Sequence, residues 1–211
     1  MNRIFECWFG EQGSGKTFQL RRMVERRLER PSIRAVFVLA PPGEWSDLVP
    51  VVDLDYACSM LGTPDHPKAV CVDVPVLGDE LDLERLLSAC KHFGDCLIVI
   101  DEAWAWFPVG RQKTFQQRQP ELFDGIVRGR HIERWDGQLR PLHIMIASQQ
   151  AGAVSHVFRE NAFVVMIGQS VWGGDNVELA RRVGGPAARD RVLKLQRWEW
   201  TAARGRDPRR G

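Results

Sequence analysis

The segment Gly10-Glu11-Gln12-Gly13-Ser14-Gly15-Lys16-Thr17 decides how this chain is built. It fits the pattern G-x-x-x-x-G-K-T, in which glycines let backbone N–H groups turn toward a common centre. Residues 4–9, before it, are apolar enough for one buried strand, and residues 17–30, after it, carry apolar side chains at helical spacing. The N-terminus of that helix adds positive potential to the loop. The segment is therefore predicted to cradle the phosphates of a nucleoside triphosphate.

Individual positions of this phosphate loop have predicted contacts. Lys16 is expected to reach the β- and γ-phosphates, and the Thr17 hydroxyl to hold Mg²⁺. A chance turn rich in glycine and serine is the alternative, but it leaves the strand, the helix and the fixed spacing unexplained. ATP and Mg²⁺ are thus the predicted cofactors. The predicted nucleotide-binding residues are Gly10, Glu11, Gln12, Gly13, Ser14, Gly15, Lys16, Thr17 and Phe18.

A second motif supplies acidic groups at the end of an apolar strand. Residues 97–100 are apolar and run directly into Asp101 and Glu102. Asp101 is expected to bind Mg²⁺ through its water shell, and Glu102 to polarise the attacking water. The simpler alternative makes Glu102 a solvated helix cap. Because a kinase needs no water-activating glutamate here, the pair favours hydrolysis over transfer to another substrate.

Gln149 is the next candidate, at the end of the apolar stretch 142–148. Its amide both donates and accepts hydrogen bonds, which suits a residue that contacts the γ-phosphate or the attacking water. An ordinary polar residue at a strand–loop junction is the alternative.

Strands that alternate with helices predict an α/β fold: a P-loop NTPase of the RecA/ASCE-like type, with a central, mostly parallel sheet flanked by helices. One motor domain is predicted over residues 1–201, with a basic, disordered tail over 202–211.

The five cysteines form no C-x-x-C pair and are interpreted as reduced core residues. No apolar run reaches membrane-spanning length. Strands are predicted at 4–9, 35–40, 69–74, 96–100, 142–147, 162–167 and 197–201, and helices at 17–30, 79–93, 121–134, 155–161, 175–183 and 186–193.

Taken together, these segments resemble the FtsK–HerA superfamily of DNA-pumping ATPases. Residues 127–131 (Val-Arg-Gly-Arg-His) are similar to its basic helix, and residues 142–150 (LHIMIASQQ) to its I-H-L-V-L-A-T-Q-R signature. Residues 158–162 and 175–185 resemble the segments that follow. Two features depart from the pattern: a polar turn is inserted at 133–141, and Gln150 stands where the family often has arginine. At this size the chain looks most like the genome-packaging ATPases of tailless, membrane-containing DNA viruses.

The resemblance implies a homo-oligomeric ring, expected to be a hexamer, that pumps double-stranded DNA through phosphate contacts in its channel. It also implies an arginine that stabilises charge on the transferring phosphoryl group. Arg128 and Arg130 are the candidates, with Arg111 and Arg118 as alternatives. A capsid or membrane-protein partner, and a place in the host cytoplasm or at a capsid vertex of the virion, are further expectations.

Three other functions stay open from the sequence. A nucleotide or metabolite kinase shares the phosphate loop but not the Asp101–Glu102 pair. An assembly module switched by ATP, without translocation, shares both motifs. A phage-assembly or toxin-like ATPase at the inner membrane is the third. Trp104, Trp106 and Phe107, beside the acidic pair, are predicted to be core or subunit-interface residues.

Overall fold

The computed structural model describes residues 4–40, 42–63, 65–73, 80–106, 120–128, 137, 141–170 and 174–205. Its strands are β1 (Phe5–Phe9), β2 (Ala35–Leu39), β3 (Val51–Val52), β4 (Ala69–Val72), β5 (Cys96–Ile100), β6 (His143–Ser148), β7 (Val164–Gly168) and β8 (Trp200–Arg204). Its helices are α1 (Lys16–Leu28), α2 (Leu54–Met60), α3 (Glu80–Phe93), α4 (Ala103–Trp106), α6 (Pro120–Arg128), α7 (His156–Asn161) and α8 (Gly174–Val192), with the short 3₁₀ turns η1 (Pro42–Glu44) and η2 (Ala151–Ala153).

The strands form one sheet in the order β3-β4-β2-β5-β6-β1-β7-β8. All neighbouring pairs are parallel except β7 and β8. In the described strands β6 lies between β1, which precedes the phosphate loop, and β5, which precedes Asp101. Because the carboxyl ends of parallel strands meet at one edge of the sheet, this order brings the three sequence motifs to that edge. The predicted α/β fold of a P-loop NTPase is confirmed.

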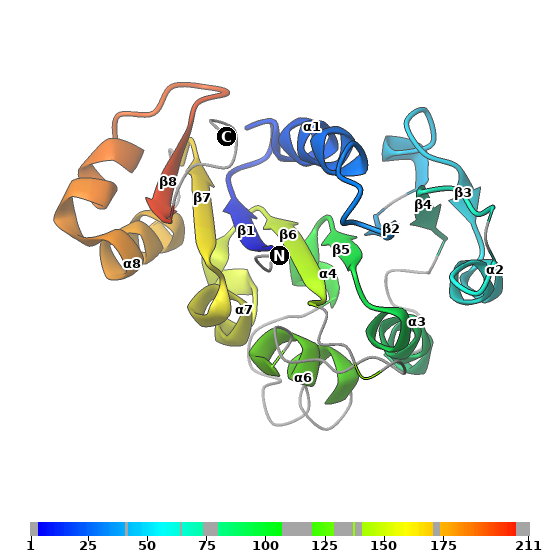
Figure 1. The fold of residues 1–211 in the computed structure, drawn as a ribbon. Coiled ribbons are helices and arrows are strands. Elements are labelled where there is room, and N and C mark those ends of the chain that lie inside the picture. Colours follow the sequence, from blue (N-terminus) through cyan, green and yellow to red (C-terminus); the bar gives the residue numbers. More distant parts are fainter. Residues whose placement is uncertain are drawn as a thin grey trace.

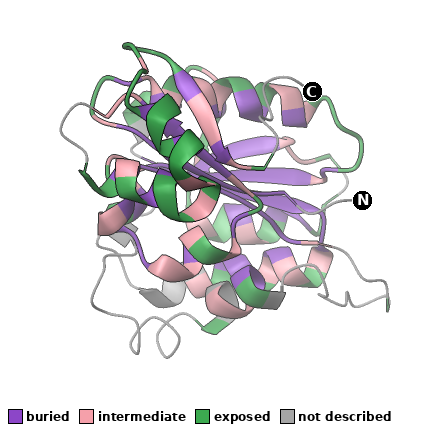
Figure 2. Cartoon of the chain, turned by 90° about the vertical axis from the view of Figure 1, so that its left-hand side faces the viewer, coloured by how far each residue is buried: buried purple, intermediate pink, exposed green. Residues whose placement is uncertain are grey.

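Helices cover both faces of the sheet (Figure 1). One apolar cluster joins Phe5, Cys7 and Phe9 of β1 to residues of α3, α6, α7 and α8. The other joins Trp8 to Leu20, Met23 and Val24 of α1. Neighbouring residues of β1 thus point to opposite faces, and the central strands are buried on both, as Figure 2 shows. This two-sided burial explains the continuous apolar runs of the sequence.

The C-terminal strand differs from the prediction. β8 covers Trp200–Arg204, three residues later than the predicted strand at 197–201, so residues 202–204 belong to the sheet and not to a disordered tail. Arg204 fixes this end, because its guanidinium donates to the carbonyls of Arg159, Glu160 and Ala162 at 3.3, 3.1 and 3.2 Å. The prediction of a disordered tail rested on its many arginines, and composition does not show that one of them binds backbone carbonyls. Residues 206–211 lie outside the described residues.

The two helices predicted at 175–183 and 186–193 are confirmed as the two halves of the kinked element α8. Gly185 interrupts it with a left-handed φ of 74°, and Pro186 follows. All five cysteines are free thiols. Within the described ranges, no helix combines the length and apolarity needed to cross a bilayer.

Candidate functional site

The phosphate loop connects β1 to α1 through a backbone that requires glycine at two positions. Gly13 and Gly15 have φ values of 76° and 85°, in the left-handed region. The amide of Ser14 donates to the carbonyl of Glu11 at 3.1 Å, which closes the turn. The amide of Gly10 donates to the carbonyl of Ser148 at 3.2 Å and so ties the loop to the end of β6. The loop therefore enters the N-terminus of α1 in a fixed, tightly turned conformation.

Two polar side chains of this loop are buried in a manner that fits an anionic ligand. The Lys16 side chain lies over the loop and its Nζ donates to the carbonyl of Glu11 at 3.2 Å. Burial lowers the pKa of Lys16, while the carboxylates of Glu102, Asp101 and Glu44 oppose that shift. The Ser14 hydroxyl is buried and has no hydrogen-bond partner in the described part of the chain. A buried hydroxyl without a partner and a buried ammonium group on one loop suit phosphate oxygens.

Thr17 and Asp101 meet at the predicted metal position. The Thr17 hydroxyl donates to Asp101 Oδ2 at 2.8 Å and also lies 3.4 Å from Glu44 Oε2. Mg²⁺ is commonly held by one or two carboxylates together with substrate phosphates and water, and these oxygen groups fit that demand. Glu44 was missed in the sequence, because it ends the short 3₁₀ turn η1 after β2, which carries no recognisable motif.

The acidic pair sits at the end of β5 in a constrained geometry. Asp101 is fully buried, and burial raises its pKa to about 6; the hydroxyl of Thr17 opposes that shift and the charges of Glu102 and Glu44 add to it. Glu102 has a left-handed φ of 55°, rare for a residue with a side chain. Its carboxylate accepts from Trp104 Nε1 at 2.7 Å.

Trp104 corrects part of the tryptophan prediction. Its side chain is 46% exposed, so it is not a core residue. It holds the Glu102 carboxylate instead, and whether it also meets another subunit stays a prediction. The side chain of Trp106 and all of Phe107 lie outside the described residues.

Gln149 follows β6 at the same edge, between the phosphate loop and the acidic pair. Its main-chain carbonyl accepts from Asn176 Nδ2 at 3.1 Å. Asn176 Oδ1 accepts from the amide of Ala151 at 2.8 Å, and Asn176 Nδ2 also donates to Ser170 Oγ at 3.1 Å. The fully buried Asn176 of α8 thus clamps the segments that follow β6 and β7. No pattern in the sequence indicated this role of Asn176.

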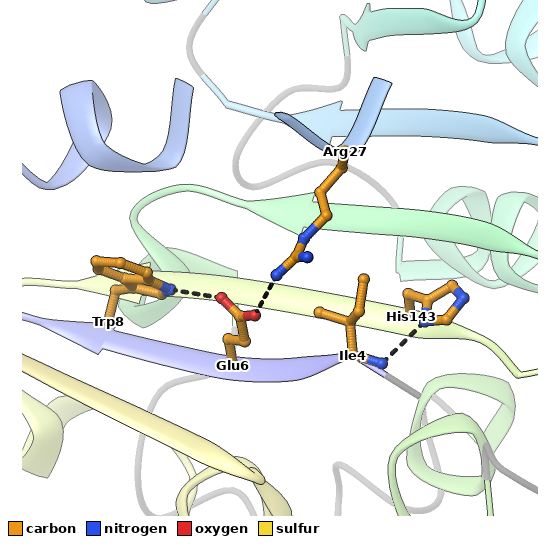
Figure 3. Close-up of polar contacts among 5 residues, drawn as sticks. All are labelled: Ile4, Glu6, Trp8, Arg27 and His143. Carbon is orange, nitrogen blue, oxygen red and sulfur yellow. Dashed lines mark hydrogen bonds and ion pairs between the residues drawn. The ribbon is translucent and has the colours of Figure 1, made fainter. Parts of the chain in front are cut away.

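A buried ion pair joins the strand before the phosphate loop to the helix after it (Figure 3). Glu6 of β1 accepts from Arg27 of α1 at 2.8 Å and from Trp8 Nε1 at 3.3 Å. Burial raises the pKa of Glu6, and the Arg27 guanidinium opposes that shift. In the same view, the Ile4 amide donates to His143 Nδ1 at 2.9 Å and links β1 to β6. The two elements that flank the phosphate loop are therefore joined to each other independently of it.

The remaining predicted residues are placed unequally. Phe18 lies on the first turn of α1 with its ring 55% exposed, and the Arg22 guanidinium sits 5.8 Å from the ring centroid. Arg128 is the last residue of α6, but nothing is described of its side chain. Arg111, Arg118 and Arg130 lie outside the described residues. The arginine assigned to the phosphoryl group stays a prediction.

Comparison with known proteins gives structural matches alone: no protein-family model matches, and no curated protein sequence matches. The genome packaging NTPase B204 from Sulfolobus turreted icosahedral virus 2, in complex with sulfate, superposes with a TM-score of 0.72 at 17% identity, covering 96% of this chain and 92% of that one. Its complex with ATP-gammaS gives 0.71 at 17% identity, with coverage of 96% and 92%. B204 from Sulfolobus turreted icosahedral virus, described as a DNA-packaging ATPase, gives 0.68 at 16% identity, with coverage of 95% and 92%. The resemblance to viral genome-packaging ATPases is confirmed at the level of the fold.

Proposed function

We propose that this chain, which shares its fold with the B204 packaging NTPases, hydrolyses ATP with Mg²⁺ and uses the energy to move double-stranded DNA during viral genome packaging. The observation that carries the proposal is the 2.8 Å contact between Thr17 and Asp101. It joins the phosphate loop to the acidic pair across 84 residues of sequence, and a nucleotide–metal site accounts for both motifs at one edge of the sheet.

Each group has a distinct part in the proposed hydrolysis. Lys16 and the loop amides bind the phosphates, while Thr17 and Asp101 hold Mg²⁺, which neutralises charge on the phosphate oxygens when bound. Glu102 accepts a proton from the attacking water, and its hydrogen bond from Trp104 fixes the carboxylate before the substrate arrives. Gln149 orients the water or the γ-phosphate, with its backbone held by Asn176.

The motor part of the proposal rests on the resemblance and the fold match. Contacts to DNA would be to phosphates, because a packaging motor must accept any sequence. A homo-oligomeric ring, proposed to be a hexamer, would complete each site with an arginine, for which Arg128 and Arg130 are the candidates. We place the ring in the host cytoplasm, at a capsid vertex with a capsid or membrane-protein partner.

The rate of ATP hydrolysis, measured against protein concentration with and without duplex DNA, tests this proposal. A motor that works as a ring gives a rate that rises faster than linearly with concentration and is stimulated by DNA in a salt-dependent manner. Hydrolysis that DNA does not change at any salt concentration would contradict translocation and leave an assembly switch. No hydrolysis unless a phosphate acceptor is added would point to a kinase.

A further inference from the structure

The connection between α8 and β8, residues 193–199, lies against the phosphate loop. A Cβ atom built on Gly15 would stand 2.5 Å from Trp198 Cε3, so the indole packs directly on this glycine. Trp200 Nε1 donates to the carbonyl of Ser14 at 3.1 Å. In Figure 1 this connection runs on the same side of the sheet as the start of α1. Two tryptophans from the end of the chain thus contact two consecutive residues of the loop.

Beside these tryptophans is an open pocket of about 510 Å³. It is lined by the end of α8, the connection and the start of β8, and its walls include Arg191, Lys194, Trp198, Glu199, Trp200 and Thr201. The walls combine an aromatic face with charged and polar groups that donate and accept hydrogen bonds. Such a mixture is typical of a small-molecule site, where apolar contact gives affinity and a few polar groups give orientation.

Trp198 is held at the pocket in an unusual conformation. Its φ of 71° is left-handed, which is rare for so bulky a residue, yet its side chain remains 52% exposed. The turn that imposes this backbone is closed by two hydrogen bonds between Gln196 and Glu199, at 2.7 and 3.1 Å. The Arg197 guanidinium sits 5.4 Å from the centroid of the Trp198 ring. A strained, half-exposed indole fixed beside a phosphate loop offers a ring on which a planar ligand can stack.

We propose that this pocket takes the nucleoside end of the bound nucleotide, with a purine base stacked on Trp198. The inference rests on the proposed binding of a nucleoside triphosphate by the phosphate loop. Two of its lining residues, Trp198 and Trp200, contact Gly15 and Ser14 of the loop, so the pocket and the phosphate loop are separated by no more than these side chains. Trp200 has a positioning role, because it ties the base pocket to the loop backbone and lies with its ring centroid 5.5 Å from that of Trp8.

Inorganic tripolyphosphate separates the two sites, because it carries the phosphates of ATP but no base. Calorimetric titration of the parent protein should give the affinity order ATP, then CTP, then tripolyphosphate, since purines stack more strongly than pyrimidines. In Trp198→Ala, ATP should bind about 10- to 100-fold more weakly while tripolyphosphate binds as in the parent. Trp198→Phe should recover most of the ATP affinity. Tyr56→Ala, which removes an exposed aromatic ring from α2 near the opposite edge of the sheet, should change neither affinity.

The other outcomes each overturn the inference in a recognisable way. Equal weakening of ATP and tripolyphosphate in Trp198→Ala would make the indole a support of the loop. Unchanged or tighter ATP binding in Trp198→Ala would mean that the indole does not contact the nucleotide or that it hinders binding. A loss of ATP affinity in Phe18→Ala, and not in Trp198→Ala, would mean that the purine base stacks on Phe18. Equal affinity of the parent for all three ligands would exclude a base site without any variant. Failure of the parent to bind either ATP or tripolyphosphate would refute the phosphate loop itself.

Discussion

Replacing Asp101 by asparagine should stabilise the empty protein while removing its function. Asp101 is fully buried, and burial raises its pKa from the ordinary value of 3.8 to about 6. The folded state therefore binds this proton more tightly than the unfolded state does. The favourable contribution of protonated Asp101 to the free energy of unfolding is complete below pH 3.8 and is lost as the pH rises through about 6. A shift of about 2 pH units corresponds to about 3 kcal/mol.

The neutral amide of Asp101→Asn lacks this titration and keeps one of the two acceptor oxygens that Asp101 offers to Thr17 and to the Glu102 amide, a loss that does not depend on pH. The difference in free energy of unfolding, variant minus parent, should therefore rise by about 2.4 kcal/mol between pH 4 and pH 7, most of the full value. Urea unfolding, with EDTA and without nucleotide, measures this difference at each pH. Asp65→Asn, which removes an exposed carboxylate, is the matched control and should show no such rise. A difference that stays flat with pH, or a variant less stable than its parent at pH 8, would refute the reasoning.

The remaining predictions concern binding, chemistry, the buried ion pair and assembly. Lys16→Ala should lose ATP binding in calorimetry, and parent-like affinity would contradict the phosphate-loop assignment. Glu102→Gln should bind ATP normally but hydrolyse it at a rate lower by at least about 100-fold, because the amide keeps the shape of the carboxylate but cannot accept the proton of the attacking water. Near-normal turnover would mean that another residue is the general base. Arg27→Ala should lower the free energy of unfolding by about 3–5 kcal/mol in urea titrations, because it leaves Glu6 buried and unpaired; a loss below about 1 kcal/mol would mean that water reaches Glu6. Mixing Arg128→Ala with parent subunits should reduce ATPase activity below simple dilution if this arginine acts across an interface, and strictly additive mixing would contradict that role.

Those parts of the site that depend on neighbouring residues could be predicted from the residue order. The turn at Gly13 and Gly15 needs left-handed backbone that glycine adopts without penalty, so the motif is visible in the residue order. The apolar run before Asp101 likewise marks a strand buried on both faces. These features depend on neighbours in the chain, and their physical requirements restrict the amino acids allowed at each position.

The distant residues that join them could not be predicted, because the folded arrangement of the strands brings them to the site. Glu44 reaches Thr17 from a loop 27 residues away, and Trp200 reaches Ser14 across 186 residues. Asn176 holds the segment after β6 because the start of α8 lies against that segment. The spacing of apolar residues in the sequence does not indicate such a contact. The end of β8 was misplaced for the same reason, since its stability comes from pairing with β7 and from the carbonyls that Arg204 contacts. Such contacts hardly restrict which amino acids occur in the neighbouring sequence. They can be recognised only in the folded structure, where the strand order brings the segments together.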